Sequence, residues 1–415
     1  MSDSAPLALD GVRVISFGAF VAGNTVALLL SELGADVVKV EPRSRPEVLR
    51  MPAYAIGEPF TEPSGVPNTV MYGALSRSTR SLSVDLANPG ARPVFHRLVA
   101  SADVVVENFA GDTLANWGCS FEELVRDNPK LVMLAMSGFG HTGPRAGYRS
   151  YASNVCGYLG LTAGWGFSHG TLSDYIAGTT SALAIIAALG FARRTGDPVH
   201  LDVAQIDTMT ALMAPLYLDP LVNGRSSPSA PNDVPGSWLS GVFPATGHDR
   251  WVAIELEDAE DWATLCRYLD RSDLATSDPG EATARRPELE AVFAAWVAER
   301  SPHTAMHLLQ KEGLAVAAVQ DSEDIWRDPQ LRSRGFMVPL DHPEFGVLNY
   351  PRPCHRLSRT PARIRRTPPR LGQHTEDVLR DWLAIGDDEL RLLEQANAVF
   401  QAPADRPGGA PPRTG

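Results

Sequence analysis

The chain has 415 residues, 44% of them hydrophobic and 21% charged, a composition typical of a folded protein large enough for two domains. Its formal net charge of −12 argues against a nucleic-acid partner, because phosphate binding needs a dense basic surface. The four cysteines form no CxxC pair, which argues against a zinc site or a disulfide framework and predicts a cytoplasmic location.

No membrane segment is expected. The N-terminus lacks a basic stretch followed by an apolar one, so the sequence predicts no secretory signal. The longest apolar run, SALAIIAALGFA, is shorter than the about 20 residues that a membrane span needs.

From Val12 to about Gly140, short β-rich runs alternate with helical patterns. The expected strands are VRVISFG, DVVKVE, DVVVENF and LVMLAMSGFG, and helices are expected around NTVALLLSELG and TLANWGCSFEELVRDN. This alternation predicts an α/β fold with a parallel sheet, a Rossmann-like large domain. Ligands of such sheets bind beyond the carboxyl ends of the strands. The loops of interest therefore follow Phe17, Val40, Val106 and Met136.

The rest of the chain suggests a second domain. DPLVNGRSSPSAPNDVPGSW has the composition of a linker, and it is followed by one strand, RWVAIEL, and several amphipathic helices. We predict a large domain over residues 1–219, a smaller inserted α+β domain with its linker over 220–333, and an extended segment over 334–415. The proline spacing of this last segment rules out long helices, so we expect it to return to the large domain, with a disordered tail from about 402.

A dinucleotide site is the first alternative to test. The first expected strand ends in GAFVAG, and the second ends at Glu41, where a ribose-binding acid would stand. However, Gly18 and Gly23 do not form a GxGxxG motif, and the middle glycine that lets the backbone approach a pyrophosphate is missing. The pattern therefore argues against a nicotinamide or flavin cofactor.

Asp174 stands in GTLSDYIAG, just before a long run of small apolar residues that closes with Arg193, Arg194 and Gly196. The local pattern predicts an N-cap, in which the carboxylate accepts hydrogen bonds from the first free amides of a helix. Nearby, His200 and Asp202 fall in a half-buried strand pattern, for which we expect a structural role.

Several segments together resemble the class III CoA-transferases, which include the formyl-CoA:oxalate and carnitine CoA-transferases and the related alpha-methylacyl-CoA racemases. The matching stretches are LDGVRVISFGAFVAGNTVALLLSELGADVVKVEP, RSTRSLSVDL, ADVVVENFAGDTLANWG, NPKLVMLAMSGFGHTGP, DPQLRSRGF and PRLGQHTEDVL. They span nearly the whole chain in family order. The resemblance implies an interlocked homodimer that moves CoA from an acyl-CoA to a carboxylic acid. Coenzyme A is then a substrate, and neither a tightly bound cofactor nor a metal is expected.

Carried over residue by residue, the resemblance assigns the nucleophilic aspartate to Asp174, which would attack the thioester to form an aspartyl-anhydride. The same carboxylate would then both cap the helix and act as the nucleophile. The family's CoA contacts fall on Val21, Ala22, Leu75, Ser76, Arg77, Ser78, Asn108, Phe109, Ala110, Arg145, Ala146, Gly147 and Tyr148. Arg43 and Arg80 are expected as phosphate partners.

The sequence departs from the family at several positions. AGD replaces a common proline-glycine pair after ENF, Val21 replaces a polar residue of the oxalate enzyme, and Asn116 replaces its CoA-binding arginine. The glycine-rich lid loop of that enzyme is not recognisable in PSAPNDVPGSW, so oxalate specificity is not inferred. Two alternatives stay open. In a racemase, a second acid-base group would face the aspartate, but the matching position holds Tyr148, a weak base at neutral pH. In a hetero-oligomer, the chain would be a non-catalytic subunit.

Overall fold

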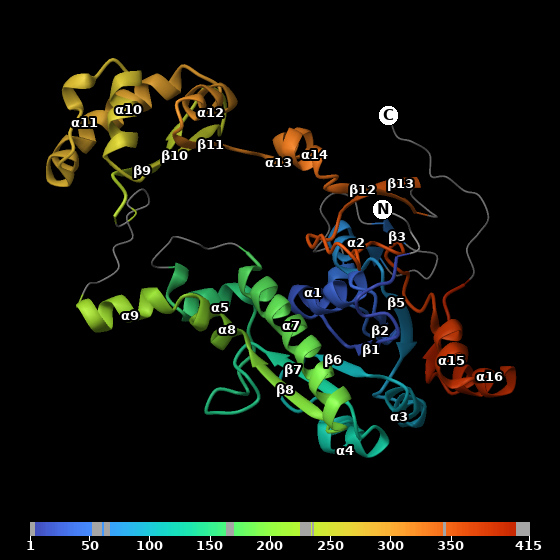
Figure 1. Cartoon of the computed structure of the whole chain (residues 1–415). Coiled ribbons are helices and arrows are strands. Elements are labelled where there is room, and N and C mark those ends of the chain that lie inside the picture. Colours follow the sequence, from blue (N-terminus) through green and yellow to red (C-terminus); the bar gives the residue numbers. More distant parts are fainter. Residues whose placement is uncertain are drawn as a thin grey trace. The chain divides into compact units, whose positions relative to one another are not determined.

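The computed structural model describes residues 5–51, 60–61, 67–162, 170–224, 234, 236–342 and 346–403. The chain divides into two compact units, one formed by Met1–Ser227 with Gly335–Gly415 and the other by Pro228–Arg334 (Figure 1). The second unit thus lies within the sequence of the first. The boundaries expected from the sequence, 220 and 333, lie close to this division. The tail expected from about 402 lies outside the described residues, apart from its first two.

The large unit is built on one seven-stranded sheet in the described part of the chain. Six of its strands run parallel, and the short β14 pairs antiparallel with β5 at one edge. This arrangement confirms the predicted α/β class. In sheet order the strands are β14 (Val399–Phe400), β5 (Arg80–Val84), β2 (Asp36–Val40), β1 (Arg13–Ser16), β6 (Val104–Glu107), β7 (Val132–Ser137) and β8 (Val199–Ala204).

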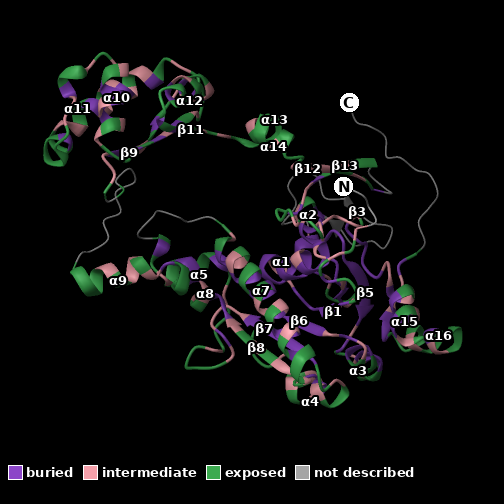
Figure 2. Ribbon diagram, viewed as in Figure 1, coloured by how far each residue is buried: buried purple, intermediate pink, exposed green. Residues whose placement is uncertain are grey.

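Helices cover both faces of this sheet, as its two hydrophobic cores require (Figure 2). Successive side chains of a strand point to opposite faces of the sheet, so that Ile15 belongs to one core and Val14 to the other. One core is closed by α3 (Arg92–Ala100), α4 (Phe121–Asp127), α15 (Thr375–Leu383) and α16 (Asp387–Gln395). The other is closed by α1 (Phe20–Glu32) and α7 (Leu172–Thr195).

The helix expected around TLANWGCSFEELVRDN is shorter than predicted. A 3-10 turn, Ala115–Trp117, ends at Gly118, whose φ of 73° belongs to the left-handed region. The helix α4 begins only after Ser120, which forms a capping box with Glu123. The glycine separates two elements that the apolar pattern joins.

Further elements surround the sheet of the large unit. They are α2 (Val70–Ser76), α5 (Ala152–Tyr158), α8 (Gln205–Leu212), α9 (Ala214–Asn223), the paired strands β12 (Met337–His342) and β13 (Gly346–Pro351), and the short pair β3 (Phe60–Thr61) and β4 (Pro67–Asn68). The elements β12, β13, α15, α16 and β14 all follow Gly335 in the chain and belong to the large unit.

The second unit has its own core around Trp262 and Phe293. Its antiparallel sheet has the order β11-β10-β9, whereas the sequence predicts only the middle strand. β9 contains Gly and Pro, and β11 contains several Ala. These residues weaken the apolar alternation by which a strand is predicted from sequence. The bounds are β9 (Leu239–Pro244), β10 (Trp251–Leu256), β11 (Ala315–Val319), α10 (Ala259–Tyr268), α11 (Pro279–Ala298), α12 (Pro302–Lys311), α13 (Ser322–Arg327) and α14 (Pro329–Ser333).

The helix α7 is longer than the apolar run in its sequence suggests. By length and composition it could cross a membrane, but a core helix passes the same test, and α7 packs against α1 and the sheet. The contact with α1 is close at Gly178, where a Cβ atom would lie 2.7 Å from Cβ of Thr25. This glycine lets α7, and hence Asp174 at its start, lie directly against α1.

Candidate active site

The loop after β1 lies very close to the backbone of the first turn of α1. A Cβ atom on Gly23 would lie 2.5 Å from the Cα atom of Gly18, so neither glycine can carry a side chain without a shift. Asn108, in the loop after β6, accepts a hydrogen bond from the amide of Ala19 at 2.7 Å and donates one to its carbonyl at 2.9 Å. The two glycines of GAFVAG therefore allow this close approach, and the structure brings the loop of the predicted CoA residue Asn108 against the loop that precedes α1, the helix that holds Ala22.

A buried lysine supports the same loop. The ammonium of Lys39 lies 2.7 Å from Oε2 of Glu47 and 2.6 Å from Oδ1 of Asn24. The other oxygen of Glu47 accepts a hydrogen bond from the amide of Phe20 at 2.9 Å. Phe20 has a φ of 54°, which is strained for an aromatic residue and persists only where its surroundings impose it.

Glu41 does not stand where a nucleotide ribose could reach it. Its carboxylate is buried against the Arg50 guanidinium, at 2.8 Å, and Arg50 lies over the ring of Tyr72. Burial alone would raise the pKa of Glu41, but Arg50 holds it below its usual value. Glu41 therefore has a structural role.

Three arginines of the predicted CoA site, Arg77 as a CoA contact and Arg43 and Arg80 as phosphate partners, differ in their surroundings. Arg77 forms an ion pair with Glu32 at 2.7 Å, and Arg80 pairs with both Asp36 and Asp381. Arg43 instead lies over the ring of Phe400, 4.4 Å from its centroid. For Arg77 and Arg80 the structure thus supplies a structural role. The CoA contact of Arg77 and the phosphate contacts of Arg43 and Arg80 stay predictions.

The other predicted CoA residues lie in two groups. The side chains of Val21, Ala22, Leu75, Ser76 and Ser78 are buried, which leaves mainly their backbone to meet a ligand. Phe109 packs against Phe17 and Trp117, and Ala110 follows it at the surface. Arg145, Ala146, Gly147 and Tyr148 lie in the loop after β7, where the Tyr148 ring meets Phe139 edge-on.

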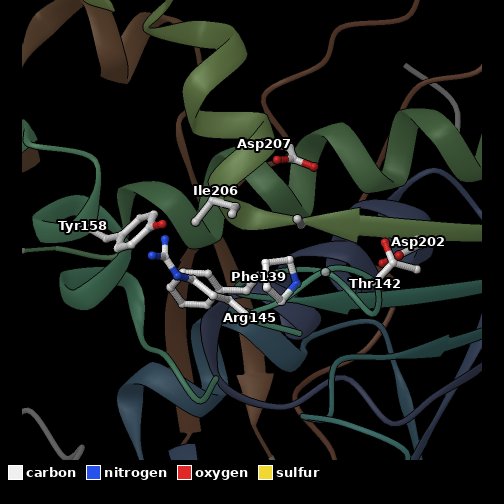
Figure 3. A pocket seen from close by; sticks show the side chains of 10 residues that line it. Phe139, Thr142, Arg145, Tyr158, Asp202, Ile206 and Asp207 are labelled. Atoms are coloured by element: carbon white, nitrogen blue, oxygen red, sulfur yellow. The ribbon is translucent and has the colours of Figure 1, made fainter. Parts of the chain in front are cut away.

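That loop forms one wall of a cavity of about 320 Å³ (Figure 3). Figure 3 shows the guanidinium of Arg145 beside the ring of Tyr158, 5.2 Å from its centroid. The opposite wall comes from the junction of β8 and α8. The lining residues are Phe139, Gly140, Thr142, Pro144, Arg145, Tyr158, Asp202, Ala204, Ile206 and Asp207.

Asp174 lies in the first turn of α7, but it is not the N-cap that the sequence predicts. The N-cap is Thr171, whose side chain makes no capping hydrogen bond, and Asp174 is the third helical residue. The spacing Thr-x-x-Asp resembles a capping box and could have revealed this position. The Asp174 carboxylate therefore does not cap the helix. The expectation that Asp174 caps α7 is wrong, and its expected role as the nucleophile stays a prediction.

The carboxylate of Asp174 is held by α8. Its Oδ1 atom accepts a hydrogen bond from Nε2 of Gln205 at 3.1 Å. Gln205 stands between Ala204 and Ile206, which line the cavity. Burial raises the pKa of Asp174 to about 6, an effect that the Gln205 hydrogen bond opposes. Asp174 is thus a partly buried carboxylate, mainly ionised at neutral pH, whose hydrogen-bond partner adjoins the cavity wall.

Three titratable groups that the sequence argument does not bring together meet at the ends of β6, β7 and β8. His141 has Nδ1 3.1 Å from Oδ1 of Asp202 and Nε2 3.4 Å from Oε1 of Glu107. The amide of His141 also donates to the Asp202 carboxylate. Glu107 and His141 lie at strand ends that the sequence marks as loops of interest, so the rule on strand ends could have found them.

Glu107 is expected to make the protein less stable as the pH rises. Burial raises its pKa to about 7, so the folded chain holds this proton more tightly than the unfolded chain. Stability contributed by Glu107 is present below about pH 4.5 and is lost as the pH rises through about 7. The Glu107→Gln variant should therefore gain stability over the wild type at pH 8, by on the order of 3 kcal/mol at most, and little at pH 4.5. Calorimetry at the two pH values measures this, and an equal difference at both would contradict it.

Comparison with known proteins defines the class. The chain belongs to CoA-transferase family III, whose model matches residues 9–375. It is accordingly an enzyme of the class III CoA-transferases, as the sequence motifs implied.

Among its relatives, the succinyl-CoA–D-citramalate CoA-transferase of Chloroflexus aurantiacus is 29% identical, over 96% of this chain and 100% of the relative. The succinate–glutarate CoA-transferase of Agrobacterium fabrum is 30% identical, over 90% and 95%. A CAIB/BAIF family protein from Brucella suis has the same fold, with a TM-score of 0.80, 25% identity, and coverage of 91% of this chain and 100% of that one.

Proposed function

We propose that this enzyme moves CoA from an acyl-CoA to a dicarboxylic acid through an anhydride on Asp174. The observation that carries the proposal is the Asp174 carboxylate itself. It is partly buried, not engaged in capping, and hydrogen-bonded through one oxygen only among the described residues, to Gln205, whose neighbours Ala204 and Ile206 line the cavity. A carboxylate in this setting is a competent nucleophile toward a thioester held against it.

The position of Asp174 suits this chemistry. The first turn of a helix favours the ionised form of a carboxylate, while burial removes the water that would weaken it as a nucleophile. Its Oδ2 atom would bond to the acyl carbon as the bond from carbon to sulfur breaks and CoA leaves as a thiolate. An acceptor carboxylate then exchanges for the donor acid, and the thiolate takes up the new acyl group. Every step exchanges one carboxylate or thiolate for another.

The substrate class is supported by the relatives. Their names specify succinyl-CoA with D-citramalate, succinate with glutarate, and succinyl-CoA with L-malate. All of these acids carry two carboxylates. We infer a dicarboxylic acceptor for this enzyme, with coenzyme A held along the loops after β1, β2, β6 and β7.

Hydroxylamine trapping tests the proposal directly. The wild type, incubated with succinyl-CoA and then with hydroxylamine, should carry a hydroxamate on the peptide that contains Asp174. Peptide mass spectrometry reads the position of the label. A hydroxamate found only on another peptide, or none, would contradict an anhydride at this residue.

We further propose that two copies of the chain assemble through α9. No residue of this helix is buried, although its sequence, APLYLDPLVN, is largely apolar; Leu221 is 81% exposed and Val222 76%. An apolar helix face that the described residues of the large unit leave exposed is typical of a protein interface.

The Leu221→Asp/Val222→Asp variant is therefore expected to be monomeric in light scattering at micromolar concentration, where the wild type is a dimer. Leu392→Asp, on α16 and 65% exposed, is the matched control and should remain dimeric. The remaining alternative is that the chain is a non-catalytic subunit of a hetero-oligomer; some relatives are named as subunits, such as the beta subunit of a succinyl-CoA–L-malate CoA-transferase. Native mass spectrometry tests this alternative, because it would detect a different partner chain. A wild-type monomer would refute the dimer.

A further inference from the structure

Two side chains connect the start of α7 to the start of α8. Nε2 of Gln205 donates to Oδ1 of Asp174 at 3.1 Å, and the hydroxyl of Ser173 donates to Oε1 of Gln205 at 3.2 Å. Ser173 is fully buried and Gln205 nearly so. The chain of bonds thus runs from Ser173 through the Gln205 amide to the carboxylate.

The chemistry of these groups fixes the direction of the Gln205 amide. An ionised carboxylate only accepts hydrogen bonds, so the amide must present its NH₂ group to Asp174. Its carbonyl oxygen then faces the hydroxyl of Ser173, which can donate. The opposite orientation would set two acceptors against each other, and this makes Ser173 the group that orients the amide.

We propose that Gln205, oriented by Ser173, is a positioning residue that holds Oδ1 of Asp174 and leaves Oδ2 to attack the thioester. This inference rests on the proposed function of Asp174. It assigns different tasks to the two oxygens of one carboxylate, and it gives a reaction role to two residues that no sequence motif singled out.

The same hydrogen bond serves the later steps. When the acceptor carboxylate attacks Cγ of the anhydride, a bond from its oxygen to Cγ forms, the bond from Cγ to Oδ2 breaks, and the donor acid leaves as a carboxylate carrying Oδ2. Negative charge collects meanwhile on Oδ1, next to the Nε2 donor of Gln205. A fixed donor at a developing oxyanion lowers the barrier without having to reorganise.

Other groups around Asp174 do not replace this donor. Cys156, on α5, is a titratable neighbour, and burial raises the pKa of its thiol; burial likewise raises the pKa of Tyr217 on α9. Asp207 lies two residues along α8, and α1 presents the uncharged Thr25 to α7. Among the described residues, Gln205 is the only side chain that donates a hydrogen bond to Asp174.

Gln205→Met tests the inference, because methionine has a similar length and no donor. The rate of CoA release from succinyl-CoA in a single turnover is measured against pH. Loss of the donor should move the acidic limb of the pH–rate profile to a higher pH by about one unit. It should also slow CoA release about tenfold at pH 8, the equivalent of one hydrogen bond. Gln330→Met, at an exposed position on α14, is the matched control and should leave both values unchanged.

Ser173→Ala provides a second measurement that does not depend on how Gln205→Met folds. It should shift the limb in the same direction by a smaller amount, because the amide stays but is no longer oriented. If either folded variant has the same pH–rate profile and rate as the wild type, while Asp174→Asn is inactive, the positioning role is overturned. The proposal that Asp174 is the nucleophile would then still stand. An active Asp174→Asn would instead refute the proposed function.

Discussion

We expect the Asp174→Asn variant to lose CoA transfer by roughly 10³-fold or more while it remains folded. An amide cannot form the anhydride, so the first covalent step is lost. The fold should survive because Asp174 caps nothing; the cap position belongs to Thr171. The asparagine can still offer its carbonyl oxygen to Gln205, and we expect the free energy of unfolding to change by less than about 1 kcal/mol.

The measurement combines steady-state transfer from succinyl-CoA to glutarate with thermal unfolding. Asp197→Asn, the same change at an exposed acid just after the end of α7, is the matched control and should retain the transfer activity. Near-normal turnover by the Asp174→Asn protein would exclude an aspartyl intermediate. The cysteines and histidines of the chain would then need to be tested as nucleophiles.

The Lys39→Met substitution is expected to destabilise the large unit by about 3–5 kcal/mol. Lys39 and Glu47 are each only 2% exposed and lie 2.7 Å apart. Removal of the lysine leaves the Glu47 carboxylate buried without its cation, and it removes the donor to Asn24 and to the carbonyl of Gly18. The loop after β1 would lose the hydrogen bond from Lys39 to the carbonyl of Gly18, which helps to hold it in place.

Chemical denaturation with urea gives the free energy of unfolding. The double variant Lys39→Met/Glu47→Gln is the control, because it removes both charges and leaves no unpaired ion. It should recover part of the lost stability. If the single and double variants are equally destabilised, the cost comes from packing and not from the unpaired carboxylate.

Much of the fold follows from local pattern in the sequence. Alternate apolar residues in DVVKVE and DVVVENF face the two cores, and this period is typical of a strand buried on both sides. The family motifs also lie along the chain in family order, and this resemblance, rather than the local pattern, implies the class of enzyme and assigns the nucleophile to Asp174. Periodicity is a property of neighbouring residues, so a single sequence contains it completely.

The surroundings of Asp174 required the tertiary structure. Gln205 lies 31 positions away from it along the chain, and Glu107 and Asp202 meet at His141 from separate strands. The ion pairs that hold Arg77 and Arg80 likewise join residues far apart in sequence. The sequence by itself determined the α/β class, because that class depends on local pattern, and its resemblance to a known family indicated the enzyme class and the candidate reacting residue. Which donor holds that residue, and which arginines are already paired, depends on contacts that exist only once the chain has folded.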